Sequence, residues 1–373
     1  MRRVLMGILI LATLGATSCI QEPQGKEVVA VDPVEKELPK LPKNIIFLIG
    51  DGMGLTQITA GLIAQRDALN LERCKFIGLS KTNSADNLIT DSAAGATAFS
   101  TGKKTYNGAI GVDMDTLPLT TIIEIAEQNG LATGLVATSS ITHATPASFI
   151  AHQKFRYMDE EIAEDFLKTE IDVFIGGGKK FFERRKDHQN LLDLLRANGY
   201  EVATGMEEIK KVSAGKLAGF IADEHPVMIT EGRGQVLAES TLKAIEILNQ
   251  NDKGFFLMAE SSQIDWGGHA NDSKYIISEM QDFDYTVGKV LDFADADGET
   301  LVIITADHET GGYGIVGGDL EAGEVEARFV TDYHTATMVP VFAYGPGAEA
   351  FAGVYHNTAI FSKMVASLGL NVQ

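Results

Sequence analysis

A carboxylate and an imidazole lie four residues apart in the densest cluster of chemically active side chains in this 373-residue chain. Residues 260–269 read Glu-Ser-Ser-Gln-Ile-Asp-Trp-Gly-Gly-His, and the pair is Asp265 and His269. On a helix, this spacing places both side chains on one face, where they can chelate a single cation. In isolation, the same pair would also fit a capping aspartate and a solvated histidine.

Asp307 and His308 form a second pair of mixed oxygen and nitrogen donors, and His334 follows further along the chain. Mixed imidazole and carboxylate ligands suit Zn²⁺, whereas sites made only of oxygen suit Mg²⁺. These residues therefore predict a metal site that contains zinc.

A serine in a stretch of small residues is the candidate nucleophile. Ser92 stands within Thr-Asp-Ser-Ala-Ala-Gly-Ala-Thr-Ala at residues 90–98. The small side chains allow a helix to begin close to another part of the backbone, and the N-terminal end of a helix favours an anion. A serine at this position is more often only an N-cap. Because no Ser-His-Asp arrangement is evident, a metal ion would have to activate the hydroxyl.

Short apolar runs rich in β-branched residues alternate with amphipathic stretches. Such continuous runs suit strands that are buried on both faces of a mostly parallel sheet. The amphipathic stretches 120–129 and 237–249 would be covering helices, so the pattern predicts an α/β fold. The expected strands are 45–49, 133–137, 173–175, 255–258, 300–304 and 339–343.

The candidate residues follow four of these expected strands. Asp51 comes after the first, His143 and Thr145 after the second, Glu260 after the fourth, and Asp307 after the fifth. The carboxyl ends of parallel strands meet at one edge of a sheet, which is where ligands bind. The sequence therefore predicts one metal-bearing site at this edge.

Six segments occur in the order found in the alkaline phosphatase family, which the chain closely resembles from residue 44 to roughly 350. The resemblance is to the compact forms from marine and cold-water bacteria. It implies a three-layer α/β/α sandwich with a mostly parallel central sheet and a much reduced crown insertion. The segments are Ile-Gly-Asp-Gly-Met-Gly (49–54), residues 90–98, Thr-His-Ala-Thr-Pro-Ala (142–147), residues 260–269, Thr-Ala-Asp-His-Glu-Thr (305–310) and His-Thr-Ala (334–336).

The resemblance implies hydrolysis of phosphate monoesters through a phosphoserine at Ser92, with a broad substrate range suited to phosphate scavenging. Arg156 would clamp the phosphate, Asp91 would position Arg156, and Trp266 would lie near the phosphate. Two Zn²⁺ ions and one Mg²⁺ ion per chain are implied. Their ligands would be Asp265, His269 and His334 at the first zinc, Asp51, Asp307 and His308 at the second, and Asp51, Thr145 and Glu260 at the magnesium, with His143 beside it.

Two positions depart from the enterobacterial members of the family. His143 replaces an aspartate near the third metal, and Trp266 replaces a lysine near the phosphate. Loss of the carboxylate should weaken Mg²⁺ binding, and the imidazole could admit Zn²⁺ or Co²⁺, so the third metal stays open. Loss of the lysine should weaken the binding of inorganic phosphate.

The formal charge of −20 argues against nucleic acid as a partner. It also repels phosphate, so the site must carry its own positive charge. In the implied site, four carboxylates contribute −4, three divalent ions +6 and Arg156 +1, which leaves about +3, and distant surface charge is screened within about 8 Å. A homodimer resting on the main domain is also expected.

The N-terminus indicates export from a bacterial cell. Residues 1–18 read as a signal peptide, with two arginines before an apolar run that is too short to span a bilayer. Cys19 follows an imperfect lipobox and would be lipidated, although ordinary cleavage and release is the alternative. Residues 20–43 form a Pro-rich linker before the phosphatase domain at 44–373. We expect a periplasmic or outer-membrane-anchored lipoprotein whose only membrane contact is this lipid.

Two other functions compete. A phosphodiesterase, sulfatase or phosphonate hydrolase of the same superfamily would share the two-metal frame but generally lacks the equivalents of Glu260, Thr145 and Arg156. A lipid-anchored protein that binds phosphate without turnover is the alternative from another class, and the presence of Ser92 beside a full ligand set argues against it.

Overall fold

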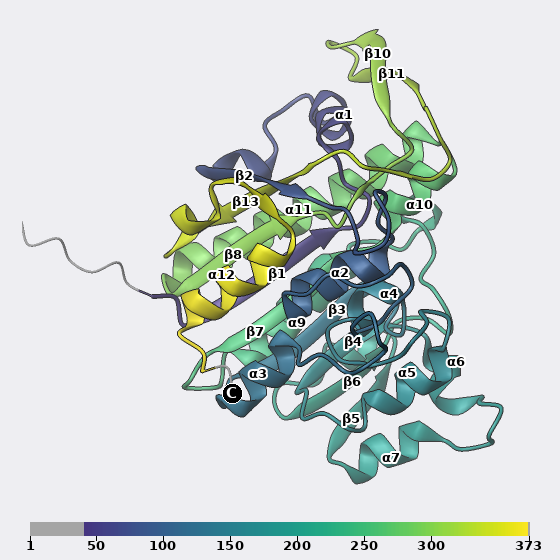
Figure 1. The fold of residues 1–373 in the computed structure, drawn as a ribbon, viewed down its shortest axis with the longest axis vertical. Helices are drawn as coiled ribbons and strands as arrows, with labels where there is room; N and C mark the ends of the chain where they lie inside the picture. The colour runs from purple at the N-terminus through teal and green to yellow at the C-terminus, as the bar shows by residue number, and fades with distance from the viewer. Residues whose placement is uncertain (1–40, 372–373) are drawn as a thin grey trace, which may run out of the picture. The chain divides into compact units, whose positions relative to one another are not determined.

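A ten-stranded sheet forms the centre of the computed structural model, which describes residues 41–371 (Figure 1). Its strand order is β14-β2-β13-β8-β1-β7-β3-β4-β6-β5, and β13 alone runs antiparallel to its neighbours in this sheet. The strands are β1 (Asn44–Gly50), β2 (Phe76–Lys81), β3 (Ala132–Ser140), β4 (Val173–Gly177), β5 (Tyr200–Thr204), β6 (Lys216–Phe220), β7 (Phe255–Ser261), β8 (Thr300–Thr305), β13 (Val339–Tyr344) and β14 (Gly353–His356).

Helices cover both faces of this sheet. Alternate residues of β1 face opposite sides: Phe47 belongs to one buried cluster and Leu48 to the other. The first face carries α2 (Ser92–Thr101), α3 (Ile122–Gln128), α4 (Ala144–Ala147), α5 (Asp159–Asp165), α6 (Lys179–Glu183), α7 (Leu191–Ala197) and α12 (Thr358–Leu368). The second carries α1 (Leu55–Gln65), α8 (Met206–Ile209), α9 (Val236–Leu248), α10 (Gln263–His269) and α11 (Ser273–Asp297).

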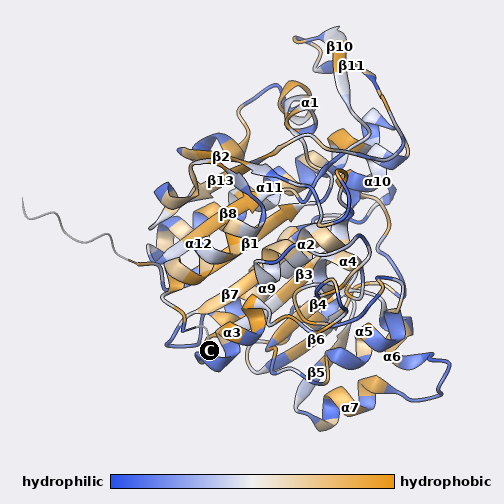
Figure 2. Ribbon diagram, in the orientation of Figure 1, coloured by the Kyte–Doolittle hydropathy of each residue, from blue (hydrophilic) through white to orange (hydrophobic). Residues whose placement is uncertain are grey.

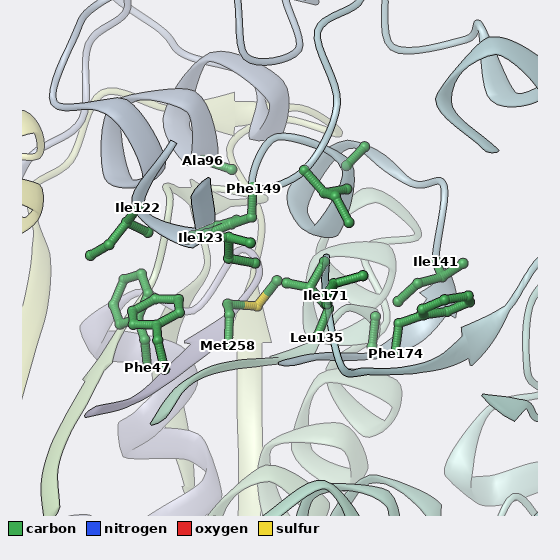
Figure 3. Close-up of a cluster of buried hydrophobic side chains, with 14 of the residues drawn as sticks. Phe47, Ala96, Ile122, Ile123, Leu135, Ile141, Phe149, Ile171, Phe174 and Met258 are labelled. Carbon is green, nitrogen blue, oxygen red and sulfur yellow. The ribbon is translucent and has the colours of Figure 1, made fainter. Parts of the chain in front are cut away.

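The core of the first face is rich in aromatic and branched side chains (Figure 3). Phe47 meets Phe99 edge-on, with ring centroids 5.5 Å apart, and Phe149 stacks on Phe256 at 6.3 Å. Figure 2 shows that the central strands are hydrophobic along their length. Continuous apolar strands are expected where both faces of a sheet are covered, so the predicted three-layer α/β/α sandwich is confirmed.

All six predicted strand runs lie within observed strands. The stretch 120–129 contains α3, and the stretch 237–249 contains all of α9 except its first residue. The helix α3 begins as its sequence suggests. Thr121 accepts a hydrogen bond from the backbone N–H of Glu124, whose carboxylate accepts one from the N–H of Thr121. Four further strands of the sheet, β2, β5, β6 and β14, were not expected from the sequence.

The segment between β8 and β13 is short and contains no large insertion. β9 (Glu309–Thr310) pairs antiparallel with β12 (His334–Thr335), and β10 (Gly314–Asp319) forms a hairpin with β11 (Glu324–Arg328). Three 3-10 helices lie at Asn70–Arg73, Ile229–Glu231 and Ala348–Phe351.

The signal peptide, Cys19 and nearly all of the predicted linker lie outside the described residues. Within residues 41–371, no helix has the length and apolar character needed to cross a bilayer.

Candidate active site

The turn after β1 brings the first carboxylate to the edge of the sheet. β1 lies between β7 and β8, with Ile49 in register with Glu260 on one side and Thr305 on the other, so Asp51, Glu260 and Asp307 emerge together. Gly52 has a φ of 74°, and a Cβ there would lie 2.7 Å from the Cα of Asp265. Only glycine fits this turn without displacing its neighbours.

Three overlapping groups of side chains could each hold a metal ion. Within each group, one ligand atom from every residue lies within 4.8 Å of the others. All their members are buried except His143, which is partly exposed. The groups are Asp265, His308 and His334; Asp51, Asp307 and His308; and Asp51, His143 and Glu260.

Two of the histidines are oriented by backbone carbonyls. The Nδ1 atom of His269 donates to the carbonyl of Asp332 at 2.7 Å, and that of His334 donates to the carbonyl of Thr90 at 2.9 Å. Their Nε2 atoms then face each other at 3.2 Å, and His269 Nε2 is 3.4 Å from a carboxylate oxygen of Asp265. Ligand histidines in proteins are commonly held in this way, with Nε2 left to coordinate a metal.

The geometry around His308 suits a metal ligand better than a general base. Its Nδ1 faces the hydroxyl of Thr310 at 3.2 Å, and not a carboxylate. Its Nε2 lies 3.2 Å from Asp307, 3.5 Å from Asp51 and 3.3 Å from the hydroxyl of Ser92. Burial lowers the pKa of His308 well below its ordinary value, so the imidazole is expected to be neutral, with no proton on Nε2. A cation would satisfy all of these atoms.

Several carboxylate oxygens of the site are buried without a hydrogen-bond partner among the described residues. They are both oxygens of Asp51, Oδ2 of Asp307 and Oε1 of Glu260, whereas Oε2 of Glu260 accepts from Ser262 at 2.6 Å. Burial raises the pKa of Asp307 and of Glu260 to about 7, and that of Asp51 well above its ordinary value. Unpaired buried carboxylates are costly unless a cation compensates them, so the residues fit bound metal ions.

The serine, the aspartate before it and the arginine meet at the start of α2. Asp91 is the N-cap, and its Oδ1 accepts from the N–H groups of Ala94 and Gly108, both at 3.0 Å. Its Oδ2 binds Nη1 of Arg156 at 3.0 Å. Ser92 is the first residue of the helix, so its expected position as the cap is wrong. Because Asp91 is the cap, the hydroxyl of Ser92 faces Nε2 of His308 instead. A Cβ on Gly95 would lie 3.1 Å from the Cβ of Asp307, which shows why α2 needs small residues here.

A cavity of about 390 Å³ opens above these groups. Ser92, Arg156, Asp265, His269 and Trp266 are among the residues that line it. The indole of Trp266 meets the ring of His143 edge-on, with centroids 6.1 Å apart. The second guanidinium nitrogen of Arg156 lies 3.4 Å from Nε2 of His143. The cavity therefore joins a nucleophile, a cationic clamp and metal-ligand side chains.

The structure brings all the predicted site residues into one region, with two differences from the predicted ligand sets. His308 lies within reach of both the Asp265 and the Asp51 groups, and His269 belongs to none of the three groups, although its Nε2 lies 3.4 Å from Asp265. Thr145 lies beside Glu260. The hydroxyl of Thr145 partly offsets the rise that burial causes in the pKa of Glu260. Sequence reasoning missed Thr310, which hydrogen-bonds both Asp265 and His308. The position of Thr310, two residues after His308 in a short strand, is the signal that could have indicated it.

This fold and site define a metal-dependent hydrolase that works on an anionic substrate. The chain belongs to the alkaline phosphatase family, whose model, described as "Alkaline phosphatase", matches residues 42–328. It is a hydrolase that acts on phosphate monoesters and binds metal.

Curated relatives cover most of the chain. Alkaline phosphatase 3 of Bacillus subtilis is 35% identical over 89% of this chain and 90% of its own length, and alkaline phosphatase of Escherichia coli is 34% identical over 89% and 87%. Among solved structures, the alkaline phosphatase from the Antarctic bacterium TAB5 is 45% identical with a TM-score of 0.85, covering 90% of this chain and all of that one. A histidine-to-aspartate mutant of that enzyme has been solved with Mg bound.

Proposed function

We propose that this protein hydrolyses phosphate monoesters by transferring the phosphoryl group to Ser92 and then to water. The observation that carries the proposal is the position of the Ser92 hydroxyl. It lies 3.3 Å from Nε2 of His308, in the same cavity as Arg156. Replacement of this serine is the decisive experiment. We also propose a broad range of phosphate monoester substrates, suited to phosphate scavenging.

The side chains divide the work between holding and attacking. Asp91 anchors one nitrogen of Arg156, and the guanidinium holds the phosphate oxygens in a planar fork. Ser92 Oγ attacks the phosphorus in line as the alcohol leaves. Water then attacks the phosphoserine from the vacated side, the bond between phosphorus and Oγ breaks, and inorganic phosphate and the serine hydroxyl are released. Bound metal ions would supply Lewis acidity to lower the pKa of the attacking hydroxyl and to stabilise the leaving oxygen.

We propose one Zn²⁺ ion at Asp265, His269 and His334, a second Zn²⁺ ion at Asp51, Asp307 and His308, and one Mg²⁺ ion at Asp51, Thr145 and Glu260. The first two groups offer imidazole nitrogen with carboxylate oxygen, which suits zinc. The third offers mainly oxygen, but His143 stands within it. Elemental analysis of the purified protein tests this assignment, and a zinc content near two per chain would support it.

His143 is expected to make the protein depend on added Mg²⁺. An imidazole is a poorer magnesium ligand than a carboxylate, so the third site should lose Mg²⁺ on dialysis. Added Mg²⁺ should then raise kcat several-fold, and His143→Asp should reach full activity at roughly tenfold lower Mg²⁺. Activity against Mg²⁺ concentration measures both effects. Full activity after exhaustive dialysis, with no response to Mg²⁺, would count against the proposal.

Replacing Trp266 by lysine is expected to strengthen inhibition by inorganic phosphate. Trp266 lines the cavity beside Arg156, so an ammonium group there would add a charge-assisted hydrogen bond to the phosphate. The inhibition constant should fall roughly tenfold, which corresponds to about 1.4 kcal/mol. Trp266→Phe, which adds no charge, is the control. An unchanged or higher constant in Trp266→Lys would refute the idea.

Hydrolysis of a nitrophenyl phosphate monoester and of the matching diester separates the proposed reaction from its nearest rival. Arg156 is placed to bind two non-bridging phosphate oxygens. A diester keeps two such oxygens but lacks the third non-bridging oxygen and the second negative charge of a monoester, for which a strongly cationic site has most affinity. We therefore propose a strong preference for the monoester. A higher kcat/KM for the diester would favour the phosphodiesterase alternative.

We also propose export from a bacterial cell, lipidation of Cys19 and a homodimer. The sequence of residues 1–19 supports the first two, with an apolar run followed by small residues and a cysteine. Mass spectrometry of the N-terminal peptide from membrane fractions tests lipidation, and light scattering of the soluble domain tests the dimer. A released, unmodified N-terminus or a monomeric domain would overturn the respective proposal.

A further inference from the structure

Four aromatic side chains line the catalytic cavity. They are Phe155, Tyr157, Trp266 and Tyr333, and we call them the aromatic rim. Phe155, Tyr157 and Tyr333 are 47%, 72% and 45% exposed. Single exposed apolar residues are common on protein surfaces and need no explanation. Three at the opening of one catalytic cavity indicate a surface that contacts a ligand.

Two members of the aromatic rim flank the phosphate clamp. Phe155 and Tyr157 precede and follow Arg156, and their rings meet edge-on with centroids 5.0 Å apart. The guanidinium carbon of Arg156 lies 5.9 Å from the centroid of Tyr157. Since Arg156 is itself held by Asp91, these rings have a fixed relation to the phosphate position.

On another part of the cavity wall, Tyr333 is backed by the metal-ligand histidines. Its ring stacks on His334 with a centroid distance of 4.4 Å and an interplanar angle of 4°, and lies 6.0 Å from the ring of His269. The backbone carbonyl of Tyr333 accepts a hydrogen bond from Gly311 at 2.9 Å. Tyr333 therefore presents a supported aromatic surface to the cavity.

A second cavity of about 580 Å³ adjoins the first at Tyr157, which lines both. Five carboxylates line it, namely Asp159, Glu160, Glu161, Glu164 and Asp187, against four cations. Three of these cations are already paired: Lys180 with Glu224 at 2.7 Å, Arg184 with Asp223, and Arg185 with Asp187. Paired cations make a poor site for a second phosphate group. The space beyond the phosphate therefore offers aromatic surface and an excess of carboxylates over cations, which do not favour an anion.

We propose that the aromatic rim binds the leaving group and favours phosphate monoesters whose alcohol carries a flat aromatic ring, such as an aryl-alkyl alcohol or a nucleoside. This inference rests on the proposed monoester hydrolysis at the same site. Offset and edge-to-face contacts between rings favour an aromatic group over an aliphatic group of similar size. A nucleobase would stack on these aromatic side chains for the same physical reason.

Three substrates with nearly equal leaving-group basicity test the proposal: 2-phenylethyl, 2-cyclohexylethyl and ethyl phosphate. The wild-type kcat/KM should be roughly three- to tenfold higher for the phenyl compound than for the cyclohexyl compound. Tyr157→Ala and Tyr333→Ala should each bring this ratio towards one, and Tyr157→Phe should retain it. Phe76→Ala is the matched control, because this exposed ring lines a different cavity and its loss should leave the ratio unchanged.

A wild-type ratio of kcat/KM near one between the phenyl and cyclohexyl compounds would overturn the proposed role of the aromatic rim. Hydrolysis of ethyl phosphate in the same experiment would still support the proposed reaction. A ratio that survives in Tyr157→Ala and Tyr333→Ala, or falls equally in Phe76→Ala, would also overturn it. If the wild-type protein hydrolyses none of the three esters, both the proposed function and the proposed role of the aromatic rim are overturned.

Discussion

Ser92→Ala is expected to lower kcat for a phosphate monoester by roughly a thousandfold or more. The methyl group cannot attack phosphorus, and the remaining side chains would only bind and polarise the ester. Bound metal should stay unchanged, because the hydroxyl of Ser92 has one hydrogen-bond partner among the described residues, Nε2 of His308, and the ring of His308 is also held by Thr310. Steady-state kinetics and elemental analysis of the same preparation measure both quantities.

Ser100→Ala is the matched control for this variant. Ser100 lies on the same helix, α2, is buried, and donates to the carbonyl of Ser148 at 2.6 Å. Its replacement should cost about 1 kcal/mol of stability but leave kcat within roughly twofold. When the protein is incubated with radiolabelled phosphate and the reaction is then quenched, the wild-type protein should carry the label on the peptide that contains Ser92. The Ser92→Ala variant should carry no label. Near-normal turnover in Ser92→Ala would contradict the assignment of Ser92 as the nucleophile.

The central strands were predictable because burial on both faces leaves a continuous apolar signature. β1 has this signature throughout, and every one of its residues is buried. Two of the four strands missed by sequence reasoning, β14 and β5, are edge strands without it. β14 is a four-residue strand at the edge of the sheet with Val354 58% exposed, and β5, at the other edge, has only two buried residues among its five. Short edge strands owe their position to the neighbouring strand that they pair with.

The metal-ligand side chains were predictable for a related reason. Parallel strands that end at one edge must bring their following residues together, so Asp51, Glu260 and Asp307 could be grouped before their geometry was known. The groups that orient these metal-ligand side chains could not be predicted. His269 and His334 are held by the carbonyls of Asp332 and Thr90, and a backbone carbonyl has no residue type to mark it in a sequence. The aromatic rim was missed because Phe155 and Tyr157 lie in a loop with no periodic pattern.

Removing the metal ions is expected to make the thermal stability of the chain fall as the pH rises from about 6.5 to 9. In the metal-free chain, burial raises the pKa of Glu260 and Asp307 to about 7, from ordinary values of 4.5 and 3.8. Hydrogen bonding to Asp265 raises the pKa of His269 to about 9, from 6.5. A proton on His269 thus stands where a metal ion would otherwise bind.

The sign follows from proton binding. Between the ordinary and the folded pKa, each of these three groups holds more protons in the folded chain than in the unfolded chain, so folding weakens as the pH rises. For Glu260 and Asp307 the loss is complete somewhat above pH 7, and for His269 it continues through about 9. His308 and His334 have lowered pKa values and act in the opposite direction, but their effect is confined to pH below about 6.5.

Calorimetry of metal-free and metal-loaded protein at pH 6.5 and pH 9 measures the effect. The metal-free chain should lose roughly 5 °C or more in Tm over this interval. The loaded chain should melt higher and change little, because metal ions replace the protons at these ligands. His269→Gln should flatten the metal-free profile, whereas His356→Gln, on β14 outside the site, should not. A metal-free Tm that stays constant or rises with pH would mean that these carboxylates are not held unpaired and buried, and the case for cations at the site would lose its physical basis.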